Sequence, residues 1–306
     1  MKKAFIQLHL AVLFAGFTAI LGKLIDLNEG MIVLYRMLLS ALVLVPIMLF
    51  SREPIKISLR SLLKIFGIGA IVAFHWVTFY GSIKYSNVSV AVVCLSTIGF
   101  FTAFLEPLII SRKIDPVEVG LGLFAVVGIY LIFNFYPEYK TGLIFGIVSA
   151  IFASIFPILN KIILPDFTSK IVTLYEMVGG FLTLCVLVPV YLTFFPSGNL
   201  IPSSADWLWL MILAVICTVV SFIFSLNALK MISAFTANLS YNLEPVYSII
   251  LAFLIFKENK FLGSGFYAGF SLIVCAIVLQ MLREWKKRKE VKNRKIRALA
   301  EVNHLA

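Results

Sequence analysis

One carboxyl group stands in the middle of a long apolar run in the second half of the chain. Glu244 lies twelve residues into the run 232–256, and Pro245 follows it. A proline within a helix frees a backbone carbonyl one turn earlier, here near Tyr241, and opens a polar kink. Because a carboxyl group can bind and release a proton, Glu244 is a candidate proton carrier. The alternative is a structural carboxyl group held by neighbouring hydroxyl or amide groups.

Further polar side chains lie close to Glu244 in the same run. Asn238, Tyr241, Asn242 and Pro245 follow the spacing i, i+3, i+4, i+7, which places them on one helical face. Polar groups on one face of an apolar helix point into a helical bundle or a cavity. We therefore predict that Asn238, Tyr241 and Asn242 line a cavity, with hydrogen bonds between helices as the alternative.

A histidine provides a second polar position, in the run 62–83. His75, Phe79 and Ser82 share a face by the spacing i, i+4, i+7. An imidazole beside aromatic rings can bind a substrate or change its charge near neutral pH, although a lone histidine can also be a core residue with satisfied hydrogen bonds. The residues that we group with His75 as a candidate site are Trp76, Phe79, Tyr80, Ser82, Ser96 and, more weakly, Ser89.

Two similar motifs place a charge just inside an apolar run. LYRM at 34–37 contains Arg36, and LYEM at 174–177 contains Glu176. One interpretation is an outer and an inner gate, one residue at each face of a membrane. The other is local ion pairing or snorkelling of the side chain to the membrane surface. The candidate ionic partners are Glu29 or Glu258 for Arg36, and Lys161 or Lys230 for Glu176.

The candidate residues are distributed over long apolar runs, and the composition explains what these runs are. The chain is 61% hydrophobic and 13% charged, whereas a soluble domain is roughly 45–50% apolar and about 25% charged. Crossing a bilayer takes roughly 20 helical residues. The runs are continuously apolar and do not alternate as barrel strands do. We predict an all-α polytopic membrane protein with ten spans, approximately 4–25, 30–50, 62–83, 87–110, 116–136, 141–163, 171–195, 205–229, 232–256 and 261–283.

The distribution of Lys and Arg predicts the orientation of these spans. With the N-terminus in the cytoplasm, 20 of the 26 basic residues fall on the cytoplasmic side and 5 on the outer side, while Arg36 lies within a span. The positive-inside rule therefore places both termini in the cytoplasm. We expect a multi-pass protein of the bacterial cytoplasmic membrane, with the bilayer as a constant partner.

The two halves of the chain repeat one pattern. Residues 11–25 align with 149–163, which matches Lys23 with Lys161, and residues 82–91 align with 228–237. An odd number of spans per repeat makes the second copy enter the membrane from the opposite side. Such inverted repeats are typical of secondary transporters. We predict a first five-helix repeat at 1–138, a second at 139–284, and a basic cytoplasmic tail at 285–306.

The second half carries a family resemblance. The run ALKMISAFTANLSYNLEPVYSIILAFLIFKEN at 228–259 contains Ala228, Lys230, Ala237, the Glu244–Pro245 pair and Glu258. With ten spans in two repeats, it resembles the EamA-type members of the drug/metabolite transporter superfamily. The resemblance implies an exporter of metabolites such as amino acids, or of toxic compounds.

The first half departs from the pattern of this family. Ile98–Gly99 stands where the repeat places the counterpart of Glu244–Pro245, and a separate Glu106–Pro107 pair follows later in the same run. Arg112 replaces the acidic residue expected after that run. The roles that the family implies are therefore not transferred to the span at 87–110.

Other function classes find little support. The net charge of +11 comes largely from the tail, where a basic cluster near anionic lipid sets topology, so we expect no nucleic-acid partner. No phosphate-binding loop or HExxH motif is present, the three histidines are scattered, and the four cysteines form no CxxC pair. We expect no enzyme activity, no metal and no cofactor.

These patterns together predict a secondary transporter of small metabolites, in the form of a proton-coupled exporter that works by alternating access. A passive facilitator of the same fold is the first alternative, and an intramembrane enzyme or a membrane assembly partner is the second. The GxxxG pairs Gly142–Gly146 and Gly265–Gly269 indicate close helix packing. These glycine pairs also permit a homodimer that forms through the last span.

Overall fold

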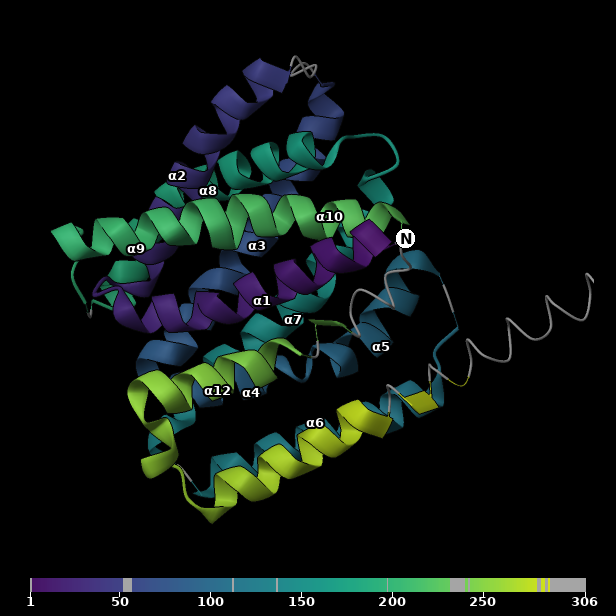
Figure 1. Ribbon diagram of the computed structural model, residues 1–306, viewed down its shortest axis with the longest axis vertical. Helices are drawn as coiled ribbons and strands as arrows, with labels where there is room; N and C mark the ends of the chain where they lie inside the picture. The colour runs from purple at the N-terminus through teal and green to yellow at the C-terminus, as the bar shows by residue number, and fades with distance from the viewer. Residues whose placement is uncertain are drawn as a thin grey trace, which may run out of the picture.

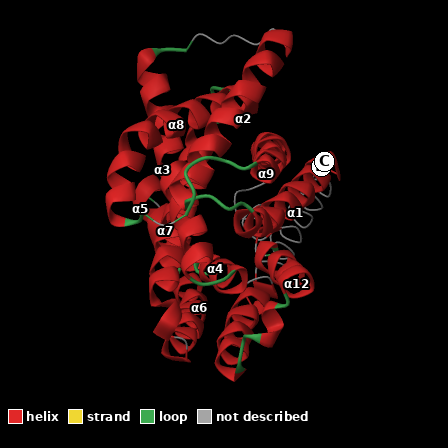
Figure 2. Cartoon of the chain, turned by 90° about the vertical axis from the view of Figure 1, so that its left-hand side faces the viewer, coloured by secondary structure: helices red, strands yellow, loops and turns green. Residues whose placement is uncertain are grey.

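The computed structural model describes residues 2–51, 57–111, 113–135, 137–196, 198–231, 240–241, 243–279, 282–283 and 286. In this described part of the chain, helix is the only regular secondary structure (Figures 1 and 2). The helices are α1 (Lys2–Leu24), α2 (Glu29–Ser51), α3 (Leu59–Tyr85), α4 (Val88–Leu95), α5 (Ile98–Ile110), α6 (Pro116–Phe135), α7 (Lys140–Ile163), α8 (Ser169–Phe194), α9 (Ser204–Ala214), α10 (Ser221–Met231), α12 (Glu244–Phe256) and the helix Ser264–Leu279. Short 3₁₀ turns lie at Pro137–Tyr139 and Glu258–Lys260, and a π-helical turn, Val215–Val220, joins α9 to α10.

Seven helical segments of the described chain are long and apolar enough to cross a membrane. They are Lys3–Leu24, Glu29–Ser51, Leu59–Tyr85, Val88–Ile110, Pro137–Ile163, Ser169–Phe194 and Ser204–Met231. Three shorter apolar helices, Pro116–Ile132, Glu244–Phe256 and Ser264–Leu279, lie within the other predicted spans. An all-α polytopic membrane protein is thus confirmed, while the total of ten spans and the inverted repeat stay predictions.

Two of the predicted spans contain a helix break. The run 87–110 divides into α4, which ends at Leu95, and α5, which begins at Ile98. In the second half, α12 begins at Glu244, with Pro245 in its first turn, where a proline fits without loss of a hydrogen bond. Glu244 is therefore the first residue of a helix, which corrects our expectation that it lies in the interior of one. Ile98 and Glu244 are the positions that the sequence repeat aligns.

The core forms where helices of the two halves pack against each other. α3 of the first half packs on α7 and α8, and α1 packs on α10 and α12. Figure 1 shows α1 alongside α10, with the beginning of α1 at the end of the molecule where α10 terminates. A Cβ on Gly69 would lie 2.2 Å from the backbone oxygen of Glu176. Glycine at this position therefore allows α3 and α8 to pack backbone against backbone.

α6 and the helix Ser264–Leu279 run side by side at one edge of the molecule (Figure 1). A Cβ on Gly128 would lie 2.6 Å from the backbone oxygen of Gly269, and a Cβ on Gly269 would lie 2.4 Å from the backbone oxygen of Gly128. Gly269 therefore serves packing within the chain. A homodimer through this glycine would have to share a surface that α6 already covers.

Candidate functional site

A cavity of about 320 Å³ lies between the two halves. It is lined by five of the predicted site residues that the structure describes, His75, Trp76, Phe79, Ser96 and Tyr241, together with Arg36 and Glu244. The cavity also reaches Lys161, Leu229 and Glu106, which lie near the ends of α7, α10 and α5. It therefore extends from the middle of the bundle towards the end of the molecule where α1 begins.

Arg36 is the charged centre of this cavity. Its side chain is 2% exposed, and the guanidinium donates from Nε to Thr218 Oγ1 at 2.7 Å, from Nη1 to the Tyr80 hydroxyl at 2.8 Å and from Nη2 to the Cys217 carbonyl at 3.3 Å. The guanidinium carbon also lies 3.5 Å from the centroid of the Trp76 ring, a cation–π contact. The expected pairing of Arg36 with Glu29 or Glu258 is wrong, because these acids bind Tyr191 and Lys23.

Two of the three acceptors for Arg36 come from the π-helical turn. A π turn shifts the hydrogen-bond ladder of its helix and such turns are often found at functional sites. Here it directs Thr218 Oγ1 and the Cys217 carbonyl towards Arg36, while Thr218 itself donates to the Leu213 carbonyl at 2.8 Å. No sequence pattern indicated this turn.

His75 is held by one serine from the other half of the chain. Its Nδ1 lies 2.8 Å from Ser149 Oγ and 3.0 Å from the Ser149 carbonyl, and Ser149 Oγ donates to the His75 carbonyl at 3.0 Å. The ring stacks against Phe79 and packs on Phe156. Nδ1 is thus engaged in the core while the ring lines the cavity, so His75 combines the two interpretations that its sequence position left open.

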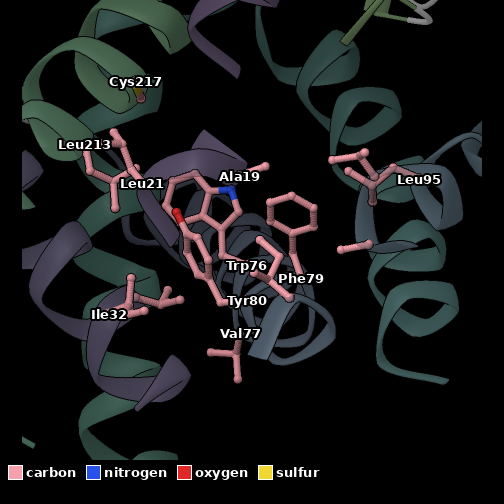
Figure 3. Packing of buried hydrophobic residues seen from close by; sticks show 14 of the residues in the cluster. Ala19, Leu21, Ile32, Trp76, Val77, Phe79, Tyr80, Leu95, Leu213 and Cys217 are labelled. Atoms are coloured by element: carbon pink, nitrogen blue, oxygen red, sulfur yellow. The ribbon is translucent and has the colours of Figure 1, made fainter. Parts of the chain in front are cut away.

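Aromatic side chains form much of the remaining wall. Figure 3 shows Trp76, Phe79 and Tyr80 projecting together from one helix. The Trp76 ring meets Phe222 edge to face at 5.5 Å between centroids, and Phe222 stacks on Phe156. Phe156 and Phe222 belong to the second half and were not predicted as site residues. Such a wall suits an apolar or aromatic part of a ligand.

The other predicted site residues have different positions. Tyr80 lies behind the cavity wall as a partner of Arg36, and Ser82 is buried without lining the cavity. Ser89 lies at the start of α4 and binds Glu258 instead. Asn238 and Asn242 are outside the residues that the structure describes, so the polar face predicted around Tyr241 stays a prediction.

Glu244 is the carboxyl group of the cavity that interacts with Arg36. It is half-buried and lines the same cavity as Arg36, with which it forms no ion pair. The Ser248 hydroxyl donates to the backbone carbonyls of Glu244 at 2.9 Å and of Gly16 at 3.1 Å, which joins α12 to α1. The carboxyl group therefore stands on a helix start that both halves position.

Glu258 closes the opposite end of the bundle. It is 3% exposed and accepts from Lys23 Nζ at 2.7 Å, from the backbone N–H of Val88 at 3.1 Å and of Ser89 at 2.9 Å, and from Ser89 Oγ at 2.7 Å. A carboxylate at a helix N-terminus that also binds a lysine is well stabilised. Through this one side chain, α1, the start of α4 and the end of α12 are joined.

Further polar contacts at the same end also connect the two halves. The backbone N–H of Asp26 donates to Asp206 Oδ1 at 2.8 Å, and Asn199 Nδ2 donates to Asp26 Oδ2 at 2.9 Å. Within the first half, Lys84 Nζ donates to the Ile25 carbonyl at 2.6 Å. The cavity is therefore sealed at this end and extends towards the other.

Glu176 lies outside the cavity and without the expected lysine partners. Lys230 donates to the Phe167 carbonyl at 2.9 Å, and Lys161 is exposed at the cavity mouth. The Glu176 side chain is fully buried, and among the described residues neither of its oxygens has a hydrogen-bond partner. The prediction of an ion pair with Lys161 or Lys230 is wrong, while the interpretation of Arg36 and Glu176 as gates stays a prediction.

A helical membrane-spanning fold around a central polar and aromatic cavity is typical of a polytopic membrane transport protein. The EamA-like transporter family matches residues 2–134 and 140–296, and the chain belongs to this family. The match makes it an EamA transporter of the drug/metabolite transporter superfamily rather than an enzyme.

Relatives and a solved structure agree with this assignment. A protein of Clostridium kluyveri is 23% identical over 279 residues, covering 85% of this chain and 87% of the relative. A protein of Archaeoglobus fulgidus is 25% identical over 192 residues, covering 62% of this chain and 67% of the relative. Both are described as uncharacterized transporters. A crystal structure covering 92% of this chain and 98% of its own superposes with a TM-score of 0.60 at 16% identity, which concerns the fold alone.

Proposed function

We propose that this protein is a proton-coupled exporter of small zwitterionic metabolites such as amino acids, and that it works by alternating access in the bacterial cytoplasmic membrane. The observation that carries the proposal is the cavity that presents Arg36 and Glu244 together with an aromatic wall. A fixed cation attracts a carboxylate, a fixed anion attracts an ammonium group, and the rings accommodate an apolar side chain. An amino acid carries all three of these groups.

The sealed and open ends of the bundle support alternating access. The network of Glu258 closes one end, and the cavity mouth lies near Lys161 at the other. With both termini in the cytoplasm, as the positive-inside rule predicts, this arrangement is the inward-facing state, ready to take up a metabolite from the cell. Export then requires the Glu258 network to open and the inner ends of α5, α7 and α10 to approach each other.

The coupling assignment rests on the position of Glu244. A carboxyl group that interacts with Arg36 across the cavity can exchange its proton for the ammonium group of a substrate. Substrate and proton would then bind the same carboxyl group alternately. This alternation would couple export of the substrate to movement of a proton in the opposite direction. A passive facilitator would have no need for this competition.

A thermal-shift comparison tests the substrate class. The probes are the twenty amino acids, their carboxyl-amidated forms and their des-amino analogues, each added to the purified protein. A ligand that binds the folded state raises its unfolding temperature by mass action. We expect at least one amino acid to stabilise the protein and both of its modified forms to lose most of the effect. Equal stabilisation by the amidated form would exclude Arg36 as the carboxylate site.

A further inference from the structure

Glu176 is a buried carboxyl group that the cavity mechanism leaves unused. It lies on α8, its side chain is 0% exposed, and neither Oε1 nor Oε2 has a hydrogen-bond partner among the described residues. The neighbouring polar side chain is the amide of Asn160 on α7, which interacts with the carboxyl group without meeting hydrogen-bond geometry. Asn160 Oδ1 is likewise buried and has no donor within the described chain.

The charged and titratable groups on the elements around Glu176 are committed to other partners or lie exposed. α8 packs against α3, α2 and α10, and Asn160 adds α7. The groups bound elsewhere are Arg36 and Glu29 of α2, His75 and Lys84 of α3, Lys230 of α10 and Lys170 of α8 itself. Arg60 and Lys64 of α3 and Lys140 and Lys161 of α7 are exposed, and Tyr175 of α8 packs on Phe66. Within the described chain, none of these groups forms a hydrogen bond with Glu176.

A carboxylate in this position would be a buried charge without a counter-charge or a donor, which is strongly unfavourable. A neutral carboxylic acid avoids this cost and brings an O–H group, the donor that Asn160 Oδ1 lacks. We propose that Glu176 is a proton-binding site and that its carboxyl group is protonated in the conformation described. The carboxylate takes its proton from water in the cavity, and loss of that proton restores the carboxylate.

The position of Asn160 connects this site to the cavity. Asn160 lines the cavity and also interacts with Glu176, so a movement of α7 relative to α8 alters both. Entry of water behind Asn160 would stabilise the charged form and release the proton. This coupling to the transport cycle rests on the proposed function, whereas the protonation of Glu176 does not.

Infrared spectroscopy of the purified protein in lipid at pH 7 tests the proposal directly. A protonated carboxyl group gives a C=O stretching band that is distinct from the carboxylate bands. We expect this band in the difference spectrum that is obtained by subtracting the spectrum of Glu176→Gln from that of the wild-type protein. In Glu176→Asp the band should shift and should not disappear. The matched control is Glu258→Gln, because Glu258 is as deeply buried but binds Lys23 and two backbone N–H groups.

The outcomes separate this proposal from the proposed function. Loss of the acid band in Glu176→Gln with no loss in Glu258→Gln supports a proton on Glu176, whether or not any metabolite is transported. A spectrum without a Glu176-dependent acid band at pH 7 overturns the proposal and leaves the exporter hypothesis untouched. If Glu176→Gln fails to fold, the Glu176→Asp spectrum decides, because an unshifted acid band would equally overturn the proposal.

Discussion

The guanidinium carbon of Arg36 lies 3.5 Å from the centroid of the Trp76 ring, and the two side chains come from different helices, α2 and α3. Hydrogen bonds to Tyr80 and to the π turn hold the guanidinium in this position. The guanidinium is thus held by neutral groups, so its positive charge can attract an anionic group of a ligand in the cavity. A ligand carboxylate would meet an arginine that needs little reorientation.

Replacing Arg36 with Lys should weaken amino-acid binding about tenfold or more. Lysine keeps the charge but cannot donate to Thr218 and Tyr80 in a fork while stacking on Trp76. Hydrogen bonds to charged groups contribute about 1.5–3 kcal/mol each. Isothermal titration with the amino acid that stabilises the wild-type protein measures the change. Unchanged affinity in the Lys variant would show that Arg36 serves packing alone.

Replacing His75 with Ala should weaken ligand binding and leave membrane insertion intact. The ring lines the cavity and stacks on Phe79, while its Nδ1 holds Ser149. We expect affinity to fall roughly tenfold, equivalent to about 1.4 kcal/mol. The control is Phe74→Ala, because Phe74 precedes His75 on α3 and is exposed on the outside of the bundle. A loss of stability with unchanged affinity would make His75 a core residue only.

Replacing Gly69 with Ala should strongly destabilise the fold. The new Cβ would lie 2.2 Å from the backbone oxygen of Glu176, and a backbone atom cannot move aside as a flexible side chain can. Overpacking of this kind typically costs about 1–3 kcal/mol and sometimes more. Thermal unfolding in detergent measures the effect. Gly67→Ala is the matched control, since its Cβ meets nothing within 4 Å, and equal stability of the two variants would refute the close contact of α3 and α8.

Replacing Glu258 with Gln should loosen the sealed end of the bundle. Glutamine cannot form the ion pair with Lys23 and binds the start of α4 less strongly. A cysteine at Ser96, in a background whose native cysteines are alanine, reports on access to the cavity. A membrane-impermeant thiol reagent added outside cells should label it several-fold faster in Glu258→Gln than in Glu138→Gln, whose carboxylate is exposed. Equal rates would mean that Glu258 does not keep this end closed.

The class of protein and several site residues followed from the sequence because their signals are local. Continuous apolar runs indicate membrane helices without any knowledge of packing. A polar residue in such a run is costly, so His75, Glu244 and Arg36 stand out as individual residues. The structure brings all three to the same cavity.

The partners of the charged side chains could not be predicted, because they depend on contacts between distant segments. Arg36 finds Thr218 across 182 positions, and Glu258 finds Ser89 across 169. Neither pairing leaves a pattern in the sequence, and charge alone suggested the wrong partners for Arg36 and Glu176. The break before Glu244 was anticipated only as a kink, because a proline is compatible both with a kinked helix and with a new helix start.

Proton-driven transport by reconstituted vesicles tests the central claim most directly. Vesicles containing the wild-type protein or Glu244→Gln receive a labelled mixture of the twenty amino acids and an imposed pH gradient. Glutamine preserves the shape of the side chain but cannot bind and release a proton, so coupling should fail while downhill exchange continues. We predict accumulation above equilibrium with the wild-type protein and equilibration without accumulation with Glu244→Gln. Accumulation by Glu244→Gln equal to that of the wild-type protein would contradict a coupling role for Glu244, and its absence in both would contradict proton-driven export of amino acids.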